Sequence, residues 1–142
     1  IRDRRRTYML LNLLSKEEKY YFLDLLTKVF TADGEVTDFE KRILQIYKTE
    51  MGDDINKHRH SNLPFEKLVE YFASKPKTTK NIVYYNIVFV SLSDEFYSVE
   101  VHEILDQIQH ELLITNKKKI ELLKAIYAEK DLREKVKRLV FE

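Results

Sequence analysis

Five acidic residues near two corners of the chain have the chemistry of a divalent-metal site. Carboxylate oxygens are the ligands that Ca²⁺, Mg²⁺ and Mn²⁺ prefer, and such a cation needs several of them around one point. The first corner lies in the stretch TADGEVTDFE at positions 31–40, and the second follows the apolar run that ends near position 92. If the two corners pack face to face, three or four carboxylates could form a weak site completed by water. The candidate ligands are Asp33, Glu40, Asp94, Glu100 and Glu103.

The first corner also has a purely structural explanation. Asp33 precedes Gly34 after an apolar run, so it can end a helix and bond the following backbone. Glu40 lies three residues after Thr37, which is the spacing of a capping box. An EF-hand loop is absent, because Leu44 stands where its bidentate glutamate would lie. The residues leave the metal site and the structural explanation both open.

Histidines form a second set of potential ligands. His102, Asp106 and His110 recur every four residues and therefore share one face of a helix. This spacing is not a zinc motif, since a tetrahedral site takes three or four ligands at short fixed spacing, so we interpret the face as solvated. His58 and His60 lie in the polar stretch DDINKHRHSN. They could take a transition metal opportunistically, and we expect weak binding because a polar loop holds its ligands loosely.

Helices must position these residues, since apolar side chains recur at three- and four-residue spacing along almost the whole chain. Only two glycines and two prolines occur in 142 residues, which disfavours a β-sandwich and a glycine-dependent nucleotide-binding fold. We therefore predict an all-α single domain, 1–142, of seven or eight helices. The expected helices are 8–14, one from Ser15 to near Gly34, one from Thr37 to about Met51, 65–73, 81–92, 99–113, 116–128 and a C-terminal one opened by Asp131 with Glu134.

The segment 81–92, NIVYYNIVFVSL, carries signals for both a strand and a helix. Its β-branched and aromatic residues favour a sheet. Its length of about 12 residues and the lack of partner strands elsewhere favour a helix instead. We predict a buried central helix, because a helix that is apolar on most sides belongs inside a bundle.

The chain partly matches itself when it is shifted by 61 residues. Asp33 then falls on Asp94, and Thr37 on Ser98. Each half becomes an apolar helix, an Asp-containing turn, a hydroxyl cap and an amphipathic helix, which predicts two pseudo-repeated halves. The second copy departs from the first at two matched positions, with Glu95 in place of Gly34 and Val101 in place of Glu40.

Two segments resemble the tellurite-resistance (TerB-like) family. They are FLDLLTKVFTADGEVTDFEKRIL in the first half and VFVSLSDEFYSVEVHEILDQIQHELLI in the second, and the resemblance covers residues 16–128. It implies an all-helical fold in two pseudo-repeated halves, each with an Asp-Gly turn and a following glutamate, and it makes Asp33, Glu40 and Asp94 the metal-binding acidic positions. A similar domain forms the N-terminal region of membrane-tethered J-domain co-chaperones.

Composition limits the remaining classes of function. A net charge of +1 provides no broad attraction for nucleic acid, although the arginines of a basic N-terminal arm, 1–7, could meet phosphate or lipid headgroups. The absence of cysteine excludes disulfides and thiolate metal sites and fits a reducing compartment. No apolar run approaches the 18 residues of a membrane span, and no signal peptide is seen. We therefore expect a cytoplasmic protein, and the family resemblance implies a place at the inner face of the membrane through a partner.

The predicted function is a non-enzymatic interaction module of a bacterial stress-response or membrane-associated complex, with a protein partner and a divalent metal at the acidic corners. The alternatives are a metal-dependent hydrolase that uses the same carboxylates and a ligand-free scaffold or oligomerisation domain. No nucleophile elbow or glycine-rich phosphate loop supports an enzyme. We also expect an exposed aromatic contact patch, because tyrosine is favoured at partner surfaces. Its candidate residues are Tyr20, Tyr71, Phe72, Tyr84 and Tyr85.

Overall fold

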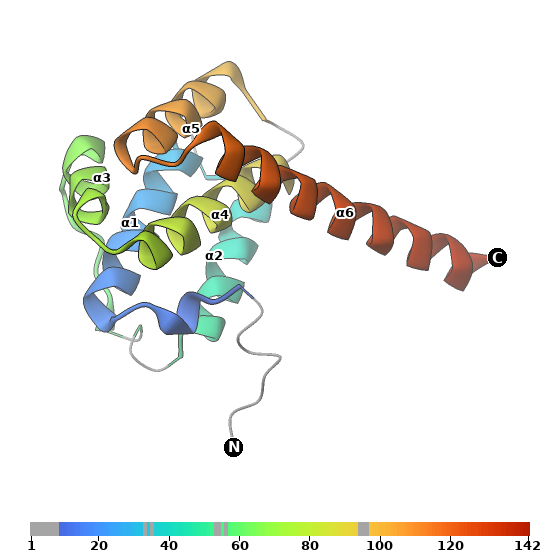
Figure 1. Cartoon of the computed structure of the whole chain (residues 1–142). Coiled ribbons are helices and arrows are strands. Elements are labelled where there is room, and N and C mark those ends of the chain that lie inside the picture. The colour runs from blue at the N-terminus through green and yellow to red at the C-terminus, as the bar shows by residue number, and fades with distance from the viewer. Residues whose placement is uncertain (1–8, 33, 35, 53–54, 56, 94–96) are drawn as a thin grey trace.

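The computed structural model describes residues 9–32, 34, 36–52, 55, 57–93 and 97–142. Within them the chain forms six α-helices and the 3₁₀-helix η2, and no strand (Figure 1). The predicted all-α class is therefore confirmed. The elements are η2 (Leu11–Leu13), α1 (Lys16–Phe30), α2 (Asp38–Met51), α3 (Phe65–Ala73), α4 (Lys77–Ser93), α5 (Val99–Glu111) and α6 (Asn116–Phe141).

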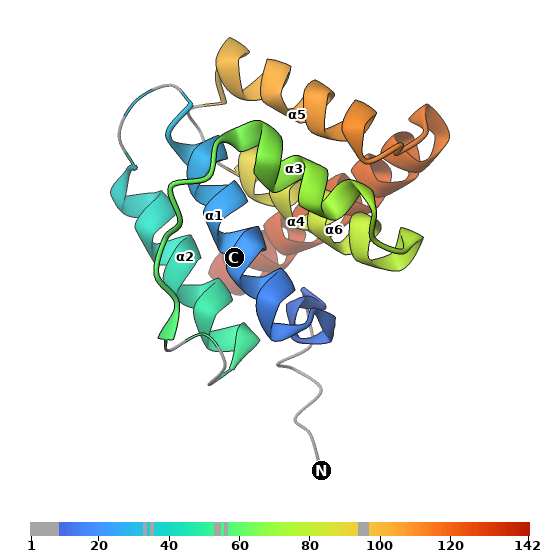
Figure 2. The same cartoon turned by 90° about the vertical axis from the view of Figure 1, so that its left-hand side faces the viewer.

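Helix α1 lies at the centre of the body and contacts α2, α3, α4 and α5 (Figures 1 and 2). It begins at a complete capping box, in which the Ser15 hydroxyl accepts from the Glu18 backbone and the Glu18 carboxylate accepts from the Ser15 backbone. Phe22, Leu23 and Leu26 are fully buried and belong to the single hydrophobic core of the described residues. An acidic residue on this helix is therefore placed next to the core.

The segment 81–92 is helical and buried, as predicted, and forms most of α4, but the central helix is α1. Ile82, Val83, Ile87, Val88 and Val90 are all in the core. The β-branched residues do not impose a strand here because burial on several sides of a helix outweighs their local preference. Helix α4 packs against α1, α3 and α5.

The predicted count of seven or eight helices is not confirmed, and its last two helices merge. The segment 116–128 and the predicted helix after Asp131 are one continuous helix, α6. Ala128 at the end of the first segment and Glu129 and Lys130 after it are strong helix formers, and no glycine or proline interrupts the run. The Asp-x-x-Glu pattern at Asp131 therefore lies inside a helix and does not start a new one.

The apolar segment 8–14 provides the short helix η2 instead of an α-helix. Its start is held between two helices. The backbone N–H of Met9 donates to Oε1 of Glu50 on α2 at 2.6 Å, and the Met9 carbonyl accepts from Nδ2 of Asn86 on α4 at 2.9 Å. The first described residues are thus fastened to the body, while the arginines of the arm 1–7 lie outside the described residues.

The 61-residue shift agrees with the helix boundaries at two places. Lys16, which starts α1, corresponds to Lys77 at the start of α4, and Asp38, which starts α2, corresponds to Val99 at the start of α5. Thr37 and Ser98 are the matching N-caps. A duplication of the two halves stays a prediction, because equal boundaries do not establish equal packing.

The predicted aromatic contact patch is wrong. Phe72 and Tyr84 are buried in the core, and burial raises the pKa of Tyr84 to about 12. Tyr20, Tyr71 and Tyr85 are partly buried against the same core, and the Tyr71 ring stacks on Tyr21 with centroids 3.6 Å apart.

Of the described helices, none combines the length and the apolar character that crossing a lipid bilayer requires.

Candidate metal centre

Asp24 is a buried carboxylate on the central helix α1. Its residues before and after, Leu23 and Leu25, are fully buried, and Asp24 itself is only 8% exposed. The connection between α2 and α3 runs alongside this part of α1 (Figure 2). An ionised carboxylate in such surroundings needs hydrogen-bond donors to offset its lost hydration. The connection supplies them.

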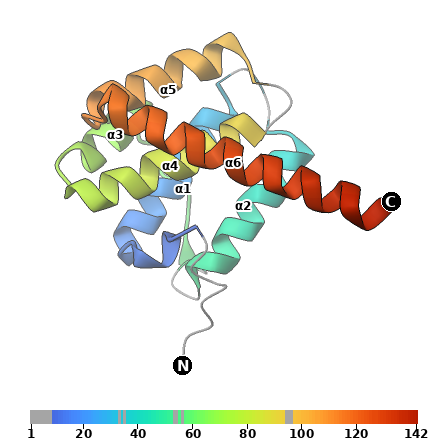
Figure 3. The same ribbon diagram turned by 45° about the vertical axis from the view of Figure 1, so that its right-hand side comes forward.

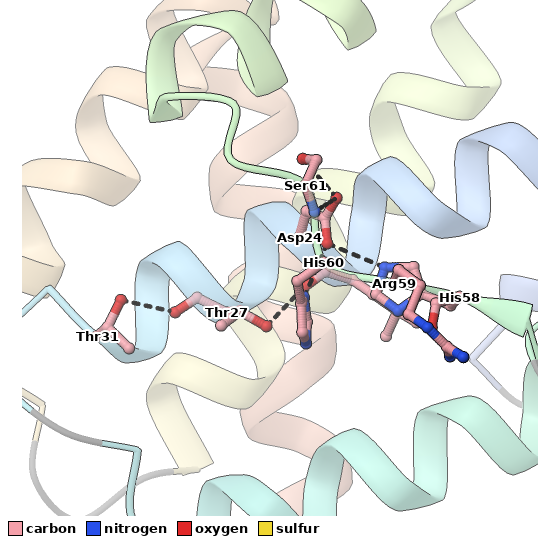
Figure 4. A network of polar contacts seen from close by, with 8 residues as sticks. Asp24, Thr27, Thr31, His58, Arg59, His60 and Ser61 are labelled. Atoms are coloured by element: carbon pink, nitrogen blue, oxygen red, sulfur yellow. Dashed lines mark hydrogen bonds and ion pairs between the residues drawn. The ribbon is translucent and has the colours of Figure 1, made fainter.

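Three residues of the connection, His58, His60 and Ser61, converge on Asp24 (Figure 4). Oδ1 of Asp24 accepts from Nε2 of His58 at 2.9 Å and from Nδ1 of His60 at 2.8 Å. Oδ2 accepts from the Ser61 hydroxyl at 2.9 Å and from the Ser61 backbone N–H at 3.3 Å. Both carboxylate oxygens are thus satisfied, and the network ties the connection to the central helix.

The two histidines sit in different surroundings. The His58 side chain is 3% exposed and the His60 side chain is 51% exposed. The His58 ring packs against Tyr20, with centroids 5.2 Å apart, and lies edge-on to His60 at 4.7 Å. Burial lowers the pKa of His58, and the nearby Asp24 carboxylate opposes that effect only in part. His58 is therefore neutral at physiological pH, with its Nε2 proton directed at Asp24.

The lowered pKa of His58 predicts a specific dependence of stability on pH. Because the folded pKa lies below the unfolded value of 6.5, the unfolded chain binds more protons between the two values. His58 should contribute its full stability above pH 6.5 and lose it as the pH falls through the folded pKa. Asp24, His60 and Lys48 are the charged or titratable groups that act on it. Urea unfolding in chelator, from pH 7.5 downward, measures this loss.

His58→Gln is the matched variant for that measurement, since an amide keeps a donor for Asp24 and does not titrate near neutral pH. Its free energy of unfolding should fall less than that of the parent between pH 6.5 and pH 5. Equal pH dependence in the two proteins would contradict the assignment of a neutral, buried His58.

Asp24, His58 and His60 can in principle hold a metal ion. One ligand atom from each lies within 4.8 Å of the others. Imidazole nitrogen and carboxylate oxygen both bind Zn²⁺, at about 2.0–2.2 Å, and tetrahedral geometry then places ligand atoms roughly 3.3 Å apart. The present contacts of 2.8 and 2.9 Å are hydrogen bonds, so the ligand atoms must separate by a few tenths of an ångström. The ring protons must also move to the opposite nitrogens.

The predicted acidic ligands are not brought together in the part of the chain that the structure describes. Asp33 and Asp94 lie outside the described residues. Glu40 is buried, and its Oε1 accepts from the Thr37 backbone at 2.8 Å in a complete capping box. Glu100 and Glu103 are exposed on α5. The shared acidic corner therefore stays a prediction, while the capping role of Glu40 is confirmed.

Comparisons of the chain with protein-family models, with curated proteins and with solved structures find no match. The resemblance to the tellurite-resistance family thus rests on the two quoted segments and stays a prediction. No residue role can be taken from a relative. The side chains of this chain define the chemistry of the site.

The second histidine set is a solvated face, as interpreted from the sequence. His102 and Asp106 are each more than half exposed, and Nε2 of His102 lies 3.4 Å from Oδ2 of Asp106. The other ring nitrogen of His102 contacts the Tyr97 hydroxyl at 2.9 Å. His110 is exposed as well. Exposed pairs of this kind contribute little and do not define a site.

Sequence reasoning found His58 and His60 but missed Asp24. The missed signal was local: in the run Phe22-Leu23-Asp24-Leu25-Leu26, one carboxylate interrupts four apolar residues on a helix. A charge so placed must be paired, because burying it without partners is costly. The histidines 34 and 36 positions further along the chain are those partners.

Proposed function

We propose that this chain is a non-enzymatic interaction module that responds to a divalent transition metal. The supporting observation is the convergence of Asp24, His58 and His60, whose ligand atoms lie within 4.8 Å of one another. One ligand comes from the central helix and two come from the connection between α2 and α3. A metal there would link α1 to the connection between α2 and α3, which are otherwise joined by hydrogen bonds.

The donor set selects the class of metal. Two imidazoles and one carboxylate suit Zn²⁺ and other late transition metals, whereas Ca²⁺ and Mg²⁺ take mainly oxygen ligands. Three protein ligands leave a fourth tetrahedral position. Because His60 is half exposed and His58 is not, solvent would reach a bound metal from the His60 side. Water or a side chain of a partner can occupy it.

The interaction role itself is supported by the family resemblance over residues 16–128. That resemblance favours a protein partner in a bacterial stress-response or membrane-associated complex. It also keeps the acidic corner of Asp33, Glu40 and Asp94 as a separate candidate for Ca²⁺, Mg²⁺ or Mn²⁺. The two candidate sites differ in donor chemistry, so different metals distinguish them.

Thermal unfolding with and without metal tests the proposal. A ligand that binds only the folded state stabilises it by about 2.7 kcal/mol at roughly 100 times its Kd. We expect Zn²⁺ to raise Tm by several degrees relative to chelator. His60→Ala should abolish the rise at little cost to the fold, since this side chain is half exposed.

His102→Ala is the matched control, because it removes an exposed histidine from α5 and should leave the Zn²⁺ response intact. An unchanged Tm of the parent in excess Zn²⁺, or an equal rise in His60→Ala, would refute the Asp24 site. A response to Ca²⁺ or Mg²⁺ that Asp33→Ala removes would favour the acidic corner. Turnover of a generic phosphoester by the metal-loaded protein would favour the hydrolase.

A further inference from the structure

The C-terminal half of α6 has no packing partner in the described fold. Helix α6 is 26 residues long, yet Ile126 is its only buried residue. Leu122 and Leu123 pack partly against the core, and every residue from 131 onward is exposed. Figures 1 and 3 both show the last turns extending past the rest of the body. The first turns of α6 therefore anchor a helix whose end projects into solvent.

The projecting half carries an apolar stripe. Leu132, Val136, Leu139 and Val140 follow the spacing i, i+4, i+7 and i+8, which places them on one helix face. They are between 50% and 69% exposed. A shallow hollow follows this face, lined by Glu129, Leu132, Arg133, Val136 and Lys137. Scattered single apolar residues are normal on a surface, but a continuous stripe of this kind indicates a contact surface.

A contact here would also add to the stability of the helix. Most helical stability in proteins comes from packing of an apolar face. The segment 131–141 has no such packing within the described residues. A second helix laid along the stripe would supply it, in the manner of helix-in-groove recognition.

Basic residues border the stripe on both sides. At 100° per residue, Arg133 and Lys137 lie along one edge, and Lys135 lies along the other next to Glu142. Lys137 contacts Glu134 at 3.5 Å in an exposed ion pair, in which a carboxylate of a partner can readily replace Glu134. Arg133 and Lys137 also line a groove between α6 and the end of α4, next to Phe89 and Leu92. We infer that the stripe 129–141 docks an amphipathic helix of a partner protein with acidic residues along its edges.

A second copy of this chain fits the stripe poorly. In a parallel pair the edge with Lys135 would face the edge with Arg133 and Lys137, and in an antiparallel pair each edge would face its own equivalent. Both arrangements bring basic side chains together, and Glu142 beside Lys135 offsets only part of this repulsion. Glu129 is the one acidic residue on the stripe face, and it lies at the N-terminal end.

An anionic membrane surface also fits poorly. Membrane-surface helices carry a strongly basic polar face. Residues 129–142 contain five basic and four acidic residues, so their net charge is only +1. The acidic side chains of Asp131 and Glu134 lie on the polar face, where anionic headgroups would repel them. A protein helix can match the basic edges without meeting that face.

Binding of two synthetic peptides to the full chain tests the inference. Both are amphipathic helices about three heptads long with leucine on the apolar face, one with glutamate and one with lysine along both edges. We expect the acidic-edged peptide to bind at least tenfold tighter by fluorescence anisotropy, as two or three edge ion pairs allow. Leu132→Glu should abolish binding, and Arg133→Glu with Lys137→Glu should reverse the preference.

Ile46→Glu is the control, since Ile46 is a 58% exposed apolar residue on α2 outside the stripe. It should leave binding unchanged. Equal binding of both peptides, self-association that Leu132→Glu abolishes, or retention on phosphatidylserine vesicles that Leu132→Glu abolishes would each overturn the acidic-helix partner. This inference deepens the proposed interaction role and rests on it. The assay is run in chelator, so loss of the metal site and loss of peptide binding are scored separately.

Discussion

Replacing Asp24 with alanine is expected to lower the free energy of unfolding by about 3 kcal/mol. The substitution leaves the buried His58 N–H without an acceptor and removes two further bonds from Ser61. An unsatisfied buried donor costs about 1–3 kcal/mol, and each lost bond to a charged acceptor adds to it. Ser61 and His60 are exposed and regain water, which limits the total. Urea unfolding in chelator measures the change.

Asp106→Ala is the matched control, because it removes an exposed carboxylate that also faces a histidine. We expect a change within about 0.5 kcal/mol. The free energy of unfolding of Asp24→Asn should lie between those of the parent and of Asp24→Ala, since an amide keeps one acceptor oxygen. If Asp24→Ala were as stable as the control, the network of Figure 4 would not fasten the connection to α1.

Replacing Phe72 with alanine is expected to cost about 3–5 kcal/mol, the range for removing a buried phenylalanine side chain. Phe72 is fully buried on α3, a helix of only nine residues that contacts α1, α4 and α5. The resulting cavity would lie where these helices meet. For a chain of this size Tm should fall by roughly 10 °C or more, which a calorimetric scan would show.

Phe141→Ala is the same substitution at an exposed site, since Phe141 is 87% exposed near the end of α6. Its Tm should stay close to that of the parent. A small loss in Phe72→Ala would indicate that α3 is not part of the cooperative core. A large loss in Phe141→Ala would indicate that the end of α6 packs against something in solution.

Local signals predicted most of the helix boundaries correctly. Ser15, Thr37, Ser98 and Thr115 all cap helices, because a hydroxyl that accepts from a first-turn N–H needs only neighbouring residues. Gly52 ends α2 with a positive φ of 89°, a conformation that glycine adopts at low cost. The same kind of signal failed at Asp131, because good helix formers on both sides outweighed it.

The amino-acid sequence by itself determined the helical class and the capped helix starts, since these depend on side chains within a few residues of one another. Only the tertiary structure decided which polar groups meet. Asp24 finds His58 and His60 because the connection between α2 and α3 runs alongside α1, a long-range contact that no local spacing encodes. Packing also left the apolar stripe of α6 outside the core, although its residues have the same helical spacing as those of the buried helix faces.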